Sequence, residues 1–207
     1  MADGYRSLKD ISLEMPTGSF TVIAGSSGSG KSSLINVGAG LKKCSSGKVL
    51  VENKDLALFT KKSYEEFLRE IVIIQRNTRL LDCLNVYQNI ALPLMLKGIN
   101  NRKIRKEVLD SLEYFGLRHK ELSSIKGLTA SQRLRVNLAR GLVKKPKAIL
   151  ADDPTFNLGV QDSGDLIDCL YKFKQMGSTI LLVISNTRIA KFKDARVRTL
   201  WRGELTH

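Results

Sequence analysis

The sequence has few cysteines, and their arrangement suggests neither a metal site nor a disulfide framework. The three cysteines, Cys44, Cys83 and Cys169, are widely spaced, odd in number and without nearby histidines. This pattern excludes the usual zinc-binding spacings and favours a reducing, cytosolic setting. We expect each thiol to be a small packing or surface residue rather than a reactive group.

Long apolar runs are also missing. The longest apolar stretches, residues 180–184 and the interrupted run 90–96, are too short to cross a bilayer as a helix. The start of the chain lacks the basic, apolar and small-residue order of a secretory signal. The sequence therefore predicts a protein that is soluble by itself.

Acidic residues are scarce relative to basic ones. Lys and Arg number 34 against 20 Asp and Glu, so the formal net charge is +14. Such an excess favours polyanionic partners: a nucleotide, a nucleic acid or the anionic face of a cytoplasmic membrane. The charge does not choose among them, and a lysine-rich solvated surface without a partner explains it equally well.

Strand-like and helix-like segments alternate along the chain, which has no internal repeat, low-complexity tract or Pro-rich linker. Apolar, β-prone runs occupy 19–24, 48–51, 70–74, 148–151 and 179–184, and helical stretches occupy 63–69, 86–97, 102–115, 131–144 and 163–174. The alternation predicts an α/β sheet with right-handed crossovers. Residues 85–126 read as helix after helix, so we expect a helical lobe there, inserted into a core formed by 1–84 and 127–207.

A glycine-rich segment between the first strand-like run and the following helix has the pattern of a phosphate-binding loop. It fits G-x-x-x-x-G-K-[ST] at every fixed position. Glycines let backbone N–H groups turn inward around phosphates, and the following helix directs its positive end at them. Lys31 is expected to reach the β- and γ-phosphates, and the Ser32 hydroxyl to bind Mg²⁺. The candidate ATP-binding residues of this loop are Gly25, Ser26, Ser27, Gly28, Ser29, Gly30, Lys31, Ser32 and Ser33.

Two adjacent carboxylates end the apolar run 148–151. Asp152 is well placed to hold Mg²⁺ through its water shell, and Asp153 to orient an attacking water. Two solvated acids at a strand end are the alternative, which the complete phosphate loop in the same chain makes the weaker interpretation.

With these motifs in place, the chain resembles the ABC ATPase family from about residue 8 to 205. The resemblance rests on four segments: LKDISLEMPTGSFTVIAGSSGSGKSSLINVGAGL, SSGKVLVENKDL, NVYQNIALPLMLKG and RVNLARGLVKKPKAILADDPTFNLG. Within the family it is most similar to the cytoplasmic subunits of the lipoprotein-releasing, macrolide-exporting and cell-division type. The resemblance implies a RecA-like P-loop NTPase core with an antiparallel β region and an inserted helical subdomain.

The resemblance also implies roles for residues outside the phosphate loop. Gln75 matches the family's Q-loop glutamine, which contacts Mg²⁺ and links the nucleotide to the helical lobe. Residues 128–132, LTASQ, occupy the place of the signature LSGGQ, which closes over the γ-phosphate bound by the other subunit of a dimer. Thr129, Ser131 and Gln132 are therefore further candidate ATP-binding residues.

The chain departs from the family at the hydrolytic machinery. Ala130 and Ser131 replace the two central signature glycines, and their side chains would crowd a backbone meant to approach phosphate closely. Asp153 stands in the place of the catalytic glutamate, which sets its carboxylate back by about 1.5 Å. Gly159 replaces the D-loop aspartate, and Ser185 replaces the switch histidine. Water-positioning and acid–base groups typically contribute about 10²–10⁴ in rate, so ATP binding with impaired hydrolysis is expected.

The N-terminus differs from the family as well. The family has a strand there with an aromatic residue that stacks on adenine, whereas Tyr5 is the only aromatic near this chain's start and its offset matches poorly. A trimmed chain and weak adenine stacking both account for this. An exposed terminal aromatic is the simpler role for Tyr5.

Three functions remain to be weighed. The first is an ATP-binding subunit that dimerises around Mg-ATP and drives a transmembrane partner from the inner, cytoplasmic face of the membrane. Its dimer partner is either a second copy or a different, competent subunit. The second is a regulatory or structural module of the same fold, as in the cell-division type. The third, a nucleic-acid-associated ABC ATPase, is disfavoured because the chain has no room for the long insertions, coiled coils or zinc modules such proteins usually carry.

Overall fold

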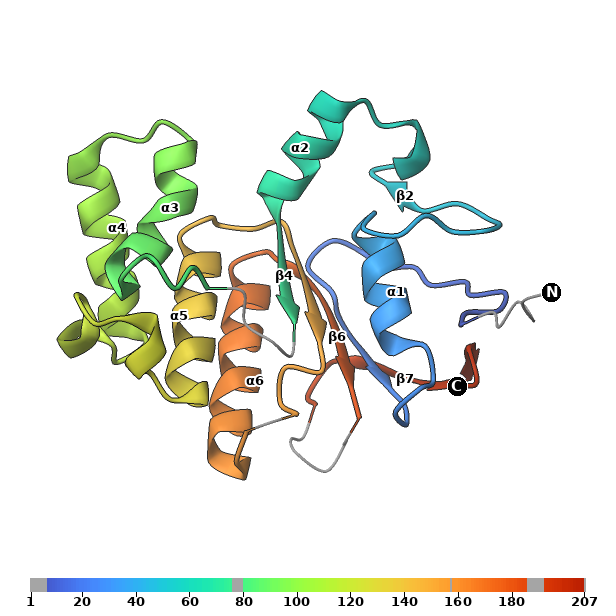
Figure 1. Cartoon of the computed structure of the whole chain (residues 1–207). Helices are drawn as coiled ribbons and strands as arrows, with labels where there is room; N and C mark the ends of the chain where they lie inside the picture. Colours follow the sequence, from blue (N-terminus) through green and yellow to red (C-terminus); the bar gives the residue numbers. More distant parts are fainter. Residues whose placement is uncertain (1–6, 76–79, 157, 186–191, 207) are drawn as a thin grey trace.

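The computed structural model describes residues 7–75, 80–156, 158–185 and 192–206, so Tyr5 lies outside the described residues. Its centre is a six-stranded sheet in the order β4-β5-β6-β1-β7-β8 (Figure 1). The strands are β1 (Phe20–Ala24), β4 (Ile71–Gln75), β5 (Ala148–Asp152), β6 (Thr179–Ile184), β7 (Arg196–Trp201) and β8 (Glu204–Thr206). All neighbouring pairs are parallel except β7 and β8, which are antiparallel.

Helices cover both faces of this sheet. The helices are α1 (Lys31–Gly38), α2 (Lys61–Glu70), α3 (Val86–Leu96), α4 (Asn101–Tyr114), α5 (Ala130–Leu142) and α6 (Val160–Gln175). Of these, α3 and α4 pack mainly against α5 and each other. One apolar cluster joins the α1 face of the sheet to α1, and a second joins the opposite face to α5, α6 and the α3–α4 pair. Every residue of β1 and of β6 is buried, which explains why these strands read as continuous apolar runs rather than as alternating ones.

A small antiparallel ribbon lies apart from the main sheet. It consists of β2 (Leu50–Val51) and β3 (Lys54–Asp55), followed by the short helical turn η1 (Leu56–Leu58). The expected strand at 48–51 is therefore shorter than predicted, and it forms the antiparallel β region that the fold class includes.

Residues 85–126 are helical, as expected. They contain α3, α4 and the turns η2 (Arg118–Lys120) and η3 (Ile125–Gly127), with only an isolated bridge between Asn85 and Ser124. A capping box at Asn85 and Gln88 begins α3, and the Asn100 side chain caps α4. The division into a core and an inserted lobe stays a prediction, since one apolar cluster runs through both.

The sequence interpretation missed the strands β3, β7 and β8 and placed the starts of helices α1 and α6 too late. The strands β7 and β8 were not predicted because β7 mixes apolar residues with arginines and is mostly exposed. Helix α1 begins at Lys31 rather than near Leu34, so the phosphate loop passes directly into the helix. In the described ranges no helix is long and apolar enough to cross a membrane.

Candidate functional site

The glycine-rich loop links the carboxyl end of β1 to the start of α1. Gly28 and Gly30 have φ of 80° and 107°, which L side chains rarely adopt. Gly30 is the N-cap of α1, and no side chain caps the helix, so its first N–H groups face the loop without a side-chain acceptor. This geometry suits an anion at the positive end of α1.

Neighbouring backbone packs against the loop and leaves no room for a side chain at Gly25 or Gly30. A Cβ on Gly25 would lie 2.5 Å from the Leu200 carbonyl oxygen, and one on Gly30 would collide with the Ser7 carbonyl oxygen. The Gly203 N–H donates to the Ser29 carbonyl at 3.1 Å. The end of β7 and the turn between β7 and β8 therefore pack against the loop, a contact that the sequence alone did not reveal.

Lys31 is buried, with 4% of its surface exposed, and its ammonium lies over the loop. The Nζ atom donates to the carbonyl oxygens of Gly25 and Ser26, both at 2.6 Å. The loop thus forms one connected structure that brings together the predicted segment from Gly25 to Ser33. Within it, the buried Ser29 hydroxyl has no hydrogen-bond partner in the part of the chain that the structure describes.

The three candidate Mg²⁺ ligands come from neighbouring elements at this end of the sheet. Gln75 ends β4 and lies in register with Asp152, which ends β5, while Ser32 is exposed in the first turn of α1. The Oδ1 atom of Asp152 is buried and has no hydrogen-bond partner among the described residues. A buried carboxylate oxygen without a partner is costly unless a cation or its water shell satisfies it. The donor set contains only oxygen atoms, so these residues fit Mg²⁺.

Asp153 is tied directly to Ser185. Its two carboxylate oxygens accept hydrogen bonds from the Ser185 N–H at 3.1 Å and from the Ser185 hydroxyl at 2.5 Å. Only 1% of Asp153 is exposed, its φ is 46°, and its N–H donates to the Val183 carbonyl at 2.8 Å. Asp153 and Ser185, which stand at two of the family's hydrolytic positions, are therefore hydrogen-bonded to each other.

The signature-like segment lies at the start of α5, across the molecule from the phosphate loop (Figure 1). Thr129 and Gln132 form a capping box, in which each side chain accepts a hydrogen bond from the other residue's backbone N–H, at 3.2 and 3.0 Å. The Ser131 hydroxyl donates to Asp162 at 2.6 Å. Thr129, Ser131 and Gln132 are thus close to one another, but the structure does not bring them to the chain's own phosphate loop.

Asp162 was missed by the sequence interpretation. It lies in the first turn of α6 and also accepts a hydrogen bond from Arg135 at 3.3 Å, while Arg135 bonds Asp165 at the same distance. An acid near the start of a predicted helix was the available signal, but its partners on α5 were not readable from spacing.

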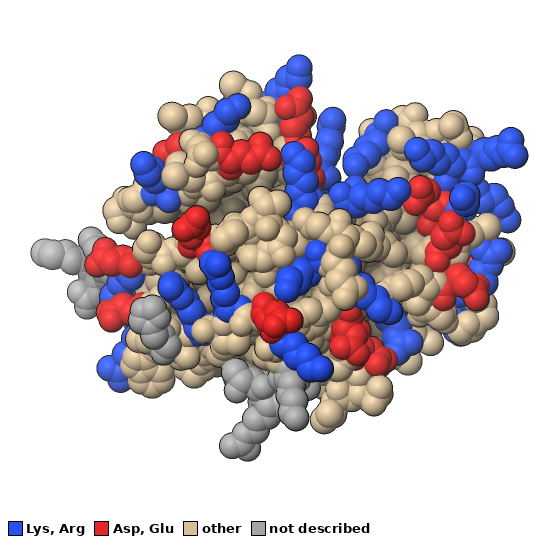
Figure 2. All heavy atoms as spheres, turned by 180° about the vertical axis from the view of Figure 1, so that it is seen from behind, with Lys and Arg blue, Asp and Glu red and all other residues tan. Residues whose placement is uncertain are grey.

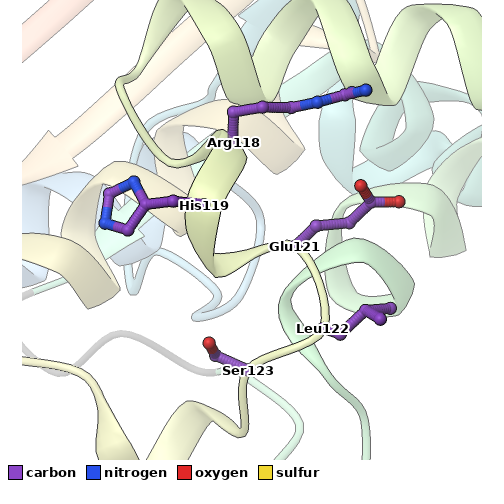
Figure 3. Close-up of a pocket in the computed structure, with 5 residues that line it drawn as sticks. All are labelled: Arg118, His119, Glu121, Leu122 and Ser123. Atoms are coloured by element: carbon purple, nitrogen blue, oxygen red, sulfur yellow. The ribbon is translucent and has the colours of Figure 1, made fainter.

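Two surface hollows lie outside the predicted site. One, of about 460 Å³, is lined by residues 118, 119 and 121–123, between α4 and α5 (Figure 3). The other, of about 390 Å³, lies beside the ends of α2 and α5. On the face seen in Figure 2, basic side chains are spread over the surface with acidic ones among them, rather than gathered in one stripe.

Comparison with known proteins connects this site to a family. A profile described as ABC transporter matches residues 8–156. The methionine import ATP-binding protein MetN of Rhizobium meliloti (strain 1021) is 32% identical over 97% of this chain and 56% of its own length. The cell division ATP-binding protein FtsE of Haemophilus influenzae is 29% identical over 97% of this chain and 92% of its own length. The chain thus spans little more than half of the first relative and nearly all of the second.

A solved structure extends the likeness to three dimensions. It is the dimeric, post-hydrolysis state of an ATP-binding cassette bound to ADP and Pi, with a TM-score of 0.87 and 28% sequence identity. The alignment covers 97% of this chain and 89% of that one. The expected fold class is confirmed, and so is the resemblance to the cell-division type.

Proposed function

Since this chain belongs to the ABC transporter family, we propose that it is an ATP-binding subunit that holds Mg-ATP tightly and hydrolyses it slowly or not at all. The observation that carries this proposal is the contrast within one site. The phosphate loop keeps all its family positions and an organised backbone, whereas Asp153 is bound at both oxygens by Ser185.

The phosphate loop supports the binding part of the proposal. Its glycines, the uncapped start of α1 and the buried Lys31 ammonium all favour negative charge at one place. On binding, the ammonium would exchange its contacts with the loop carbonyls at Gly25 and Ser26 for phosphate oxygens. That exchange replaces neutral acceptors with charged ones and strengthens each hydrogen bond.

The assignment of Mg²⁺ rests on the ligand chemistry. Ser32, Gln75 and Asp152 would hold the ion, and the partnerless Asp152 oxygen is the part of the set that a cation or its water shell would satisfy. When bound, Mg²⁺ neutralises charge on the phosphate oxygens.

The weak-hydrolysis part rests on Asp153. A residue that orients water needs a carboxylate oxygen facing the water, and the two hydrogen bonds from Ser185 hold the Asp153 carboxylate toward Ser185 instead. The aspartate side chain is also about 1.5 Å shorter than a glutamate would be. Both effects oppose hydrolysis without touching the residues proposed to bind ATP.

The place of the signature-like segment supports a dimer. Because the start of α5 lies across the molecule from the phosphate loop, a second ATP-binding chain would have to supply this segment to each nucleotide (Figure 1). The similar solved structure of an ATP-binding cassette bound to ADP and Pi is itself dimeric. We propose a homodimer or a pair with a different ATP-binding subunit, attached to a transmembrane partner at the inner face of the membrane.

In a second candidate function, ATP binding regulates a partner through dimerisation and does not drive transport. The occupied Asp153 carboxylate and the cell division relative favour a regulatory module in which ATP-dependent dimerisation itself is the output. The spread of mixed charges on the face seen in Figure 2 does not favour a nucleic-acid interface on that face, where a basic stripe would be expected.

The experiment is a pair of measurements on the purified chain, the ATP dissociation constant and the steady-state rate of phosphate release, with Lys31→Ala as the control. We expect Mg-dependent binding in the wild-type chain, with turnover close to that of the control. Robust turnover that Lys31→Ala and Asp153→Asn both abolish would contradict weak hydrolysis, and absence of binding would contradict the whole proposal.

A further inference from the structure

The signature-like segment has lost both central glycines, yet two backbone N–H groups in the first turn of α5 still have no acceptor within the helix. The Thr129–Gln132 capping box satisfies the N–H groups of these two residues. At the first positions of a helix, the N–H groups of Ala130 and Ser131 have no intrahelical acceptor. These two donors, together with the positive end of α5, are what the segment offers to a phosphate.

The Ser131 side chain is held against α6. Its hydroxyl donates to the Asp162 carboxylate at 2.6 Å, a short, charge-assisted bond. Arg135, one turn further along α5, donates to the same carboxylate oxygen and to Asp165, which fixes Asp162 from a second side. The expected crowding of the backbone by Ser131 therefore depends on whether Asp162 keeps this side chain in place.

We propose that Asp162 is a positioning residue that holds the Ser131 side chain toward α6, and that this keeps the signature-like segment able to receive the phosphate of ATP bound by a partner chain. The inference rests on the proposed ATP-dependent dimer. It replaces the expectation of simple crowding with a compensated pair, in which a residue of α6 offsets the loss of a glycine in α5.

A purely structural role for Asp162 makes a different prediction. Gly159 supplies no side-chain cap to α6, so an acid in the first turn stabilises that helix through its dipole. Such a role would lower the melting temperature on substitution, but it would not depend on the side chain at position 131. The two roles are therefore separated by a double-variant test.

The test compares Asp162→Ala, Ser131→Gly, the double variant and Asp165→Ala. Asp165→Ala is the matched control, because it removes the same charge from the same helix and one Arg135 contact but leaves the Ser131 bond intact. Sedimentation with Mg-ATP gives the dimer dissociation constant, nucleotide titration gives ATP affinity of the monomer, and thermal unfolding reports stability.

We expect Asp162→Ala to weaken the Mg-ATP dimer about tenfold, since a released Ser131 hydroxyl could rotate to other χ1 positions and crowd the two N–H donors. The ATP affinity of the monomer should stay unchanged. Ser131→Gly removes the side chain that Asp162 holds, so adding it to Asp162→Ala should restore the dimer even though the melting temperature stays low.

Two results would overturn the inference while leaving the proposed function standing. One is a double variant as weak as Asp162→Ala, and the other is an Asp165→Ala control that loses as much dimer as Asp162→Ala. A wild-type chain that binds Mg-ATP and stays monomeric would instead remove the proposed homodimer, and the inference would fall with it.

Discussion

Removing the Ser185 hydroxyl should raise ATP turnover. In Ser185→Ala the Asp153 Oδ2 atom loses its 2.5 Å hydrogen bond, while the Ser185 backbone N–H remains to bind Oδ1 at 3.1 Å. The carboxylate is 1% exposed, so solvent does not already compete with the hydroxyl for it. The Oδ2 atom would then be held by one hydrogen bond fewer, so the carboxylate could turn more readily toward a water.

The size of the effect follows from the bond that is lost. A hydrogen bond to a charged group is worth about 1.5–3 kcal/mol, and 1.4 kcal/mol is a factor of ten in an equilibrium. The orientation of the Asp153 carboxylate that accepts the Ser185 hydroxyl bond is therefore favoured over other orientations by about ten- to a hundredfold. Because the backbone bond persists, we expect turnover to rise by about tenfold, with stability reduced by about 1–3 kcal/mol for the lost hydrogen bond.

The assay is steady-state phosphate release at saturating Mg-ATP, with the rate of Lys31→Ala subtracted. Ser185→Thr is the matched variant, since it keeps a hydroxyl and should keep the wild-type rate. Turnover in Ser185→Ala that is equal to or below wild type, with unchanged ATP affinity, would refute the reasoning. Ser185 would then assist whatever hydrolysis the chain performs.

Three further predictions concern the loop, a buried lysine and the thiols. Gly30→Ala should cost at least about 2 kcal/mol of stability and abolish ATP binding, because its φ is 107° and a Cβ there meets the Ser7 carbonyl. Gly38→Ala, which has open space at its Cβ, should leave both unchanged in the same urea-unfolding and binding assays. Burial and nearby cations lower the pKa of Lys144 from 10.5 to about 8. The unfolded chain therefore binds more protons between these values, so stability should rise with pH across that window, by about 1–2 kcal/mol after solvent screening. Lys144→Met should lack that rise in urea unfolding at pH 7.5 and 10, and an equal rise in both proteins would contradict the assignment. Burial raises the pKa of Cys169 to about 12, so a thiol reagent at pH 8 should label the two exposed cysteines of the native chain and reach the third only after unfolding.

Local features of the sequence were sufficient to predict the phosphate loop and most of the sheet. The loop depends on backbone conformations that only glycine adopts easily and on one lysine at a fixed spacing. The sequence pattern therefore specifies the local structure almost completely. Strands buried on both faces read as continuous apolar runs, which is why β1, β5 and β6 were recognised. Strand β7 was missed because its exposed arginines break that pattern.

What each functional side chain touches was decided by tertiary structure alone. Ser185 and Asp153 are separated by 32 residues, and Ser131 and Asp162 by 31, yet each pair shares a short hydrogen bond. These contacts depend on strand order, on register and on which way a side chain leaves its helix, none of which is encoded in local periodicity. The sequence thus predicted where phosphate would bind, whereas the packing of β5 against β6 and of α5 beside α6 determined which side chains contact Asp153 and Ser131.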